Sequence, residues 1–168
     1  MVTGLKIGGW PVTLETTELL AAQKHFGGVL GHRGDASEAL GWICLYRLDG
    51  TVPWVLWLYS GEIDGPAIGG FQWQQLESGA RMDRRCRKLD MKTGTVELLP
   101  SPLRLGMTAA QVERILGKPS GKYRDRLFYD PEQNLTDRNE PYTLDNDVLI
   151  VFRNGQVWAI EANHTTQS

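Results

Sequence analysis

The residue types that most often carry out catalysis or bind metals are few and scattered in this sequence. The three histidines, His25, His32 and His164, have no ligand-like spacing. None of them belongs to a recognisable nucleophile or metal motif. We therefore predict no catalytic residue, no metal site and no cofactor, and interpret the histidines as surface or helix-end residues.

Two acidic residues come closest to a catalytic pair. Glu62 and Asp64 lie in a turn bounded by glycine and proline, where two carboxylates could act together. Acidic residues are also common in turns for conformational reasons alone. We favour the second interpretation and keep both residues as candidate contacts to a partner.

A basic stretch lies near the middle of the chain. Residues 81–88 contain four arginines and a lysine, with Asp83 among them. Such a stretch can bind phosphate or an acidic partner, with Arg84, Arg85 and Arg87 as anion contacts. It can also form a charged edge strand that discourages aggregation, which is the interpretation that we favour.

Large aromatic residues are concentrated in the predicted strands of the first half. They are Trp42, Tyr46, Trp54, Trp57, Tyr59, Phe71 and Trp73. Side chains alternate between the two faces along a strand. Trp57 and Tyr59 therefore share a face, and Trp54 points the other way. A single small core layer does not readily absorb so many rings, so some must lie on the face away from the helix.

Exposed tryptophan and tyrosine are typical anchors of protein interfaces, because they combine a large contact area with a polar atom. The alternative is that these rings pack between the two halves of the chain. The predicted partner-binding residues are Trp42, Tyr46, Trp54, Trp57, Tyr59, Glu62, Asp64 and Trp73.

Composition excludes several classes of partner and compartment. The formal net charge is −2 and the pI is about 5.9, so no overall field attracts nucleic acid or an anionic membrane. The first residues lack a basic segment followed by an apolar one, and no run of 18 apolar residues occurs. These features predict a cytoplasmic protein. Cys44 and Cys86 would meet reducing conditions there, so we expect two free thiols.

The clearest helix of the sequence begins after Thr108. Gln111 follows three residues later, which predicts a capping box, and Gly117 and Pro119 mark the end of the helix. By the same logic an earlier helix is expected over residues 14–26.

Strands are predicted after each helix. They are expected over residues 39–48, 53–59, 67–76, 81–89 and 95–99, and then over 122–129, 147–153 and 156–162. Asn154-Gly155 predicts a tight hairpin between the last two strands. The polar segment 130–145 is expected to be a loop.

The chain divides near Pro100-Ser101-Pro102. The tetrad Leu103-Arg104-Leu105-Gly106 that follows repeats the pattern of Leu5-Lys6-Ile7-Gly8, and such self-similarity indicates duplication. We therefore predict an α+β fold of two tandem modules, residues 1–100 and 101–168. Each would have a helical segment packed on an antiparallel sheet of three to four strands.

The second half contains a motif of a known family. Leu105-Gly106-Met107-Thr108, then Ile115-Leu116-Gly117-Lys118-Pro119 and then Tyr129 resemble the signature of the small outer-membrane lipoproteins of the SmpA/OmlA (BamE) type. The resemblance covers roughly residues 103–162 and leaves the first half as a diverged copy. That family is related in fold to the β-lactamase inhibitor protein, a tandem of helix-plus-sheet modules. The resemblance implies a sheet surface that binds another protein, and it assigns no catalytic role.

These observations predict a non-catalytic protein that binds one protein partner through a sheet surface, with no nucleic-acid or membrane partner. The most concrete form of this prediction is a bacterial immunity protein that neutralises a toxin. One alternative is a small-ligand enzyme or sensor that uses a cleft between the modules. Another, implied by the lipoprotein resemblance, is a scaffold component of an envelope or secretion assembly.

Overall fold

The computed structural model describes residues 1–34, 40–61, 65–131, 133–137 and 140–167. The strands and helices run in the order β1 (Gly4–Ile7), β2 (Trp10–Thr13), α1 (Leu19–Phe26), β3 (Gly31–Arg33), β4 (Leu40–Arg47), β5 (Trp54–Gly61), β6 (Gly70–Gln75), β7 (Arg87–Lys88), β8 (Val96–Leu99), α2 (Ala109–Leu116), β9 (Gly121–Tyr123), β10 (Arg126–Tyr129), β11 (Gln133–Asp137), β12 (Glu140–Arg153) and β13 (Gln156–Gln167).

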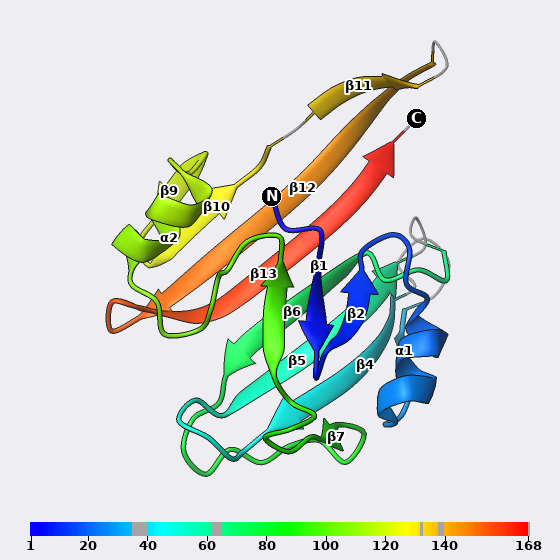
Figure 1. Cartoon of the computed structure of the whole chain (residues 1–168), viewed down its shortest axis with the longest axis vertical. Coiled ribbons are helices and arrows are strands. Elements are labelled where there is room, and N and C mark those ends of the chain that lie inside the picture. The colour runs from blue at the N-terminus through cyan, green and yellow to red at the C-terminus, as the bar shows by residue number, and fades with distance from the viewer. Residues whose placement is uncertain (35–39, 62–64, 132, 138–139, 168) are drawn as a thin grey trace.

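One ten-stranded sheet dominates the structure (Figure 1). Its main path is β3-β4-β5-β6-β13-β12-β10-β9, with β11 paired to β12 and β7 paired to β4. A three-stranded sheet in the order β2-β1-β8 lies in front of the middle of the large one in Figure 1, with α1 and α2 on opposite sides of it. Both helices and the small sheet therefore cover the same face of the large sheet.

The α+β prediction of two separate helix-plus-sheet modules is wrong. Strands account for 48% of the structure and helices for 11%, so the protein is mostly β. Strand β6 of the first half pairs directly with β13 of the second half. This pairing merges the strands of both halves into one sheet. Its register places Trp73 opposite Ile160 and Phe71 opposite Ala162, so that the apolar face continues across the junction. The division of the chain near residue 100 stays a prediction.

The hydrophobic core lies on the covered face of the large sheet. Core side chains from alternate positions of the strands pack against Leu5 and Ile7 of β1, Leu19 of α1 and Val112 of α2. The strand residues in the core are Ile43, Leu45, Trp54, Leu56, Leu58, Phe71, Trp73, Leu127, Tyr129, Val148, Ile150, Phe152, Val157, Ile160 and Ala162. Burial of this one face is the main source of stability, because apolar area removed from water is the dominant favourable term in folding.

The helix over residues 14–26 is shorter than predicted. It begins at Leu19, because Glu15 has φ of 59° and the backbone N–H of Thr17 donates to the Thr13 carbonyl in a tight turn. The second helix is confirmed, with both hydrogen bonds of the Thr108 capping box present.

Several strand predictions need correction. The strand expected over residues 81–89 is reduced to Arg87–Lys88. The strand over residues 122–129 is a hairpin, because Arg124 has φ of 52° between β9 and β10. The loop expected over residues 130–145 instead contains β11 and the start of β12.

The hairpin at Asn154-Gly155 is confirmed, with φ of 52° and 75° at the two turn residues. The β1–β2 hairpin was not predicted, because each of its strands has only four residues. A buried amide attaches this N-terminal segment to the large sheet. The Asn146 side chain accepts from the backbone N–H of Val2 and donates to the Val2 carbonyl, at 3.2 and 3.0 Å.

The expectation of two free thiols is wrong. Cys44 of β4 and Cys86 form a disulfide that closes a loop with a sequence separation of 42 residues. The cysteines are far apart in the sequence, but β7 pairs with β4 and brings Cys86 beside Cys44. We call residues 77–86 the disulfide strap, because the bond attaches this segment to the sheet.

Reduction of the disulfide should lower the free energy of unfolding by about 3–4 kcal/mol, because a loop of this length restricts the unfolded chain. Urea unfolding of the oxidised and the dithiothreitol-treated protein measures the difference. In the control, Cys44→Ala/Cys86→Ser, the reductant should have no effect. Equal unfolding midpoints for the oxidised and reduced wild type would contradict the prediction.

Candidate functional site

The face of the large sheet that points away from the helices and the small sheet carries the candidate site. We call it the open face. The side chains of its two central rows are absent from the hydrophobic core cluster, and the disulfide strap lies beside Trp42 and Trp57 at one end of it. Residues that lie opposite one another in neighbouring strands form rows across this face.

Two rows contain most of the functional side chains. The first row is Gly31, Trp42, Tyr59, Gly70, Asn163 and Asp147. The second row is Cys44, Trp57, Gln72, Glu161, Leu149 and Phe128. Aromatic residues therefore occupy the β4 and β5 side of the open face, and acidic residues occupy the β12 and β13 side.

Three adjoining hollows form a groove along these rows, which we call the open-face groove. The central hollow, of about 520 Å³, is lined by Arg33, Leu40, Trp42, Trp57, Tyr59, Gln72, Glu161 and Asn163. It shares Trp42 and Trp57 with a hollow beside the disulfide strap. It shares Glu161 and Asn163 with a third hollow, beside β10 and β12. The groove therefore crosses the junction between β6 and β13.

A glycine allows Tyr59 to cross that junction. The hydroxyl of Tyr59 donates to Oδ1 of Asn163 at 2.5 Å and lies 3.4 Å from Oε1 of Glu161. The ring passes over Gly70 of the intervening strand, where a Cβ atom would lie 2.6 Å from the ring and would also overlap the Asn163 side chain. Only glycine leaves room for this contact between the two halves of the sheet.

At the end of the groove beside β3 and β4, a glycine again makes room for an aromatic ring. Trp42 lies over Gly31, where a Cβ atom would overlap the indole ring. On the other side of the indole, the Arg85 guanidinium lies 4.8 Å from the ring centre, a cation–π contact. Arg85 is oriented by a bidentate pair with Asp83, whose pKa falls to about 2 because Arg85 donates hydrogen bonds to it.

Carboxylates gather at the β12 end of the groove. Asp130, Asp147 and Glu161 line the third hollow, which contains no lysine or arginine among its described lining residues. Partial burial raises the pKa of Asp147, and the nearby carboxyls of Asp130 and Asp145 raise it further. The groove therefore carries an excess of negative charge at this end.

The structure places three of the predicted site residues together. Trp42, Trp57 and Tyr59 are half-buried and line the central hollow. Tyr46 is half-buried and lies on the same face, in the next row, opposite Val55.

Two predicted site residues are misplaced. Trp54 and Trp73 have only 2% and 6% of their surface exposed and belong to the core on the opposite face. Trp54 does point away from Trp57, as alternation predicted, but that direction leads into the core. Glu62 and Asp64 lie outside the described residues.

Sequence reasoning missed Gln72, Glu161 and Asn163. Gln72 lies opposite Trp57 in the neighbouring strand β6. Glu161 and Asn163 join the aromatic residues only because β6 pairs with β13, about 90 residues further along the chain. The alternation of Glu161 and Asn163 with Ile160 and Ala162 was the available signal, since it predicts a strand with one polar face.

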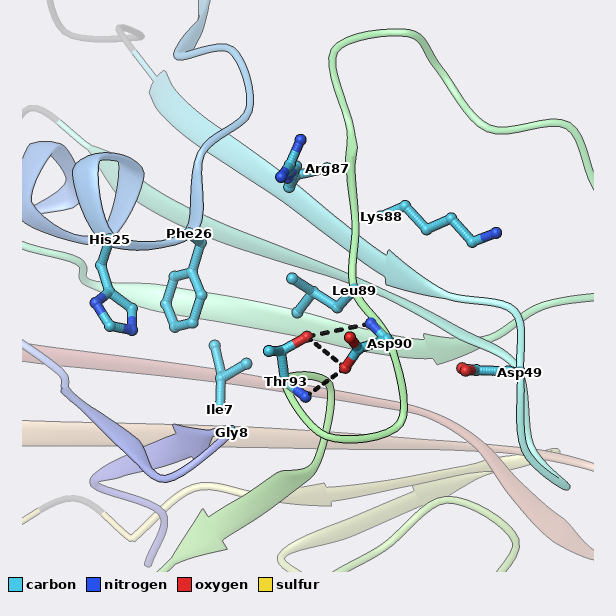
Figure 2. A pocket seen from close by; sticks show the side chains of 10 residues that line it. All are labelled: Ile7, Gly8, His25, Phe26, Asp49, Arg87, Lys88, Leu89, Asp90 and Thr93. Carbon is cyan, nitrogen blue, oxygen red and sulfur yellow. Dashed lines mark hydrogen bonds between the residues drawn. The ribbon is translucent and has the colours of Figure 1, made fainter.

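A further cavity lies on the other side of the sheet, between β1, α1 and the segment 87–93 (Figure 2). It measures about 660 Å³ and is lined by Ile7, Gly8, His25, Phe26, Asp49, Arg87, Lys88, Leu89, Asp90 and Thr93. Its charged groups are balanced between two cations and two carboxylates. Asp90 is occupied within its own turn, where it accepts from the backbone N–H groups of Lys92 and Thr93 and from the Thr93 hydroxyl. These hydrogen bonds lower the pKa of Asp90.

The arginines considered as anion contacts do not converge. Arg85 lies over Trp42 on the open face, whereas Arg87 lines the cavity near α1. Within the part of the chain that the structure describes, no group of three or more His, Cys, Asp or Glu residues is arranged to hold a metal ion.

Neither helix within the described ranges has the length and apolar character of a membrane span. Searches against protein-family models, curated proteins and solved structures return no match to this chain. The resemblance to the SmpA/OmlA lipoproteins therefore stays a prediction.

Gly70→Ala should destabilise the protein by about 1–3 kcal/mol, because the new methyl group would overlap Tyr59 and Asn163. Urea unfolding measures this loss. Gly121→Ala is the matched control, since its Cβ would lie 3.8 Å from the nearest atom of Phe128. A loss for Gly70→Ala no larger than for the control would show that the Tyr59 ring does not need this space.

Asp147→Asn should raise Tm at neutral pH, because it removes a carboxylate whose ionised form is disfavoured by burial and by two neighbouring acids. A raised pKa means that the folded wild type binds this proton more tightly than the unfolded chain. The wild type therefore recovers stability as the pH falls, and the difference in Tm should shrink. Thermal melts between pH 8 and pH 4 test this. Asp125→Asn, at an exposed acid 4.0 Å from Arg126, should give no such gain.

Proposed function

We propose that this chain is a non-catalytic protein that binds one protein partner through the open-face groove. The observation that carries the proposal is the arrangement of Trp42, Trp57 and Tyr59 around one uncovered hollow. Each ring is partly exposed, and each is fixed by the sheet or by a glycine beneath it. Rigid aromatic side chains lose little entropy on binding, which makes them effective interface anchors.

The shape of the site supports a macromolecular partner better than a small substrate. The groove is a series of open hollows along a sheet, whereas sites for small molecules are usually enclosed and bury most of the ligand. The groove also lacks a nucleophile paired with a base among its described lining residues. An inhibitor that covers the surface of its partner fits this arrangement, and a bacterial immunity protein that neutralises a toxin is its most concrete form.

The disulfide bears on the compartment in which the protein acts. Disulfides persist in oxidising compartments and are rare in the cytosol. The Cys44–Cys86 bond therefore favours an oxidising compartment over the cytoplasmic location predicted from the sequence.

A second candidate function uses the cavity near α1. A small-ligand enzyme or sensor would place its ligand between His25, Arg87 and Lys88 (Figure 2). The observation behind this candidate is a cavity of about 660 Å³ with cations on one side, a volume within the range of small-molecule sites that also includes the hollows of the groove. The scaffold function rests on the lipoprotein resemblance alone.

Trp57→Ala should remove the partner that co-purifies with the tagged protein from native lysate, because loss of a central interface aromatic costs about 2 kcal/mol or more. Co-purification followed by mass spectrometry measures this. The matched control is Leu20→Ala, at a position on α1 that is 47% exposed and distant from the groove. Circular dichroism verifies that both variants are folded.

Two results would contradict the proposal. The first is equal recovery of the partner by wild type and Trp57→Ala. The second is recovery of the bait alone together with stabilisation of the wild type by a small anion in a melting assay, which would favour the cavity near α1.

A further inference from the structure

The third hollow of the groove has an unbalanced charge that its described surroundings do not neutralise. Its volume is about 440 Å³, and Asp130, Asp147 and Glu161 line it beside the apolar side chains of Phe128 and Leu149. Partial burial and the nearby acids make ionisation of Asp147 less favourable, so its pKa is raised.

The cations of the neighbouring strands β9 and β10 either have other contacts or lie on the other face. Arg126 of β10 lies on the open face but is 4.0 Å from Asp125. The Arg124 guanidinium lies 5.2 Å from the centre of the Tyr123 ring. Lys122 lies opposite Leu127, whose side chain is in the core on the other face. Arg33 lines the central hollow together with Glu161, but it does not line the third hollow. Because no described cation lines the third hollow, a partner can supply one there.

The groove shows how such a cation would be received. Arg85 already lies over the Trp42 ring at the strap end, so the aromatic residues of the groove accept a guanidinium. At the other end Phe128 is 38% exposed and borders the carboxylates. An arginine side chain fits this combination, because its planar head binds carboxylates in pairs and its stem packs on apolar surface.

We propose that the third hollow binds an arginine or lysine of the partner protein, and that apolar residues beside it in the partner contact Trp57 and Tyr59 in the central hollow. The two hollows share Glu161 and Asn163, so one continuous segment of the partner reaches both. This inference rests on the proposed function and specifies the chemistry of its partner.

A set of short blocked peptides tests the inference without knowledge of the partner. The peptides are identical except for a central arginine, glutamine or glutamate, and each has leucine on both sides of that residue. Binding to the full chain is measured from NMR amide shifts. The arginine peptide should bind at least about tenfold more tightly than the glutamate peptide and should shift the amides of Asp147, Glu161 and Asn163, because opposite charges attract and like charges repel in a partly desolvated hollow.

The double variant Asp147→Asn/Glu161→Gln should reduce the preference for arginine strongly, because it leaves Asp130 as the one carboxylate among the described lining residues of the hollow. These changes preserve side-chain size, and the amide oxygen introduced at position 161 can still face the Tyr59 hydroxyl. Asp90→Asn is the matched control, since this acid lies in the cavity near α1 and its removal should leave the preference intact.

Other outcomes would overturn the inference. If all three peptides bind the groove equally and Trp57→Ala weakens them equally, the groove binds apolar segments without charge selection, and the proposed function stands while the inference fails. If the arginine preference is undiminished in the double variant, the cation binds elsewhere. If no peptide shifts the groove amides, the hollow does not recognise this chemistry, and co-purification with Trp57→Ala judges the proposed function independently.

Discussion

The pairing of β6 with β13 is the constraint on which the rest of the structure depends. It brings residues 70–75 beside residues 159–163 and makes a single sheet from strands of both halves. Its register continues the apolar face through Trp73 and Ile160, so that one core lies beneath the small sheet and both helices. The same register places Gly70 beside Asn163 on the opposite face. A shift by one residue would exchange the two faces of one half, which would bury Glu161 and expose Ile160.

The open-face groove follows from that register together with two glycines. Large aromatic rings on a sheet normally stand away from it, but Gly31 and Gly70 let Trp42 and Tyr59 lie across the neighbouring strand. The rings of Trp42 and Tyr59 therefore line the groove and remain partly exposed. The Tyr59–Asn163 hydrogen bond connects the aromatic and acidic sides, so the fold itself holds both sides of the groove in place. Such preorganisation reduces the entropy lost on binding.

Local patterns in the sequence predicted local structure well. The capping box at Thr108, the Asn154-Gly155 turn and the opposite direction of Trp54 all depend on neighbouring residues, and the structure confirms them. The predicted fold class was wrong, because the fold class depends on which edge strands pair. The alternation of polar and apolar residues predicts where a strand is, but it does not say which strand of the other half pairs with it. The same limit explains why Trp42, Trp57 and Tyr59 were predicted as site residues while Glu161 and Asn163 were not. The disulfide was missed because the short parallel contact of β7 with β4 has no signature in the sequence.

The open face carries a physical cost that is better explained by binding than by folding. Trp42, Trp57 and Tyr59 keep part of their apolar surface in water, and Asp147 is placed among like charges. A sheet selected only for stability would carry β-branched or paired residues at these positions. The disulfide strap compensates at one end, because it attaches residues 77–86 beside Trp42 and restricts the unfolded chain. At the other end Phe128 is 38% exposed beside Asp130, Asp147 and Glu161, so this end of the open face combines accessible apolar surface with repulsion among like charges.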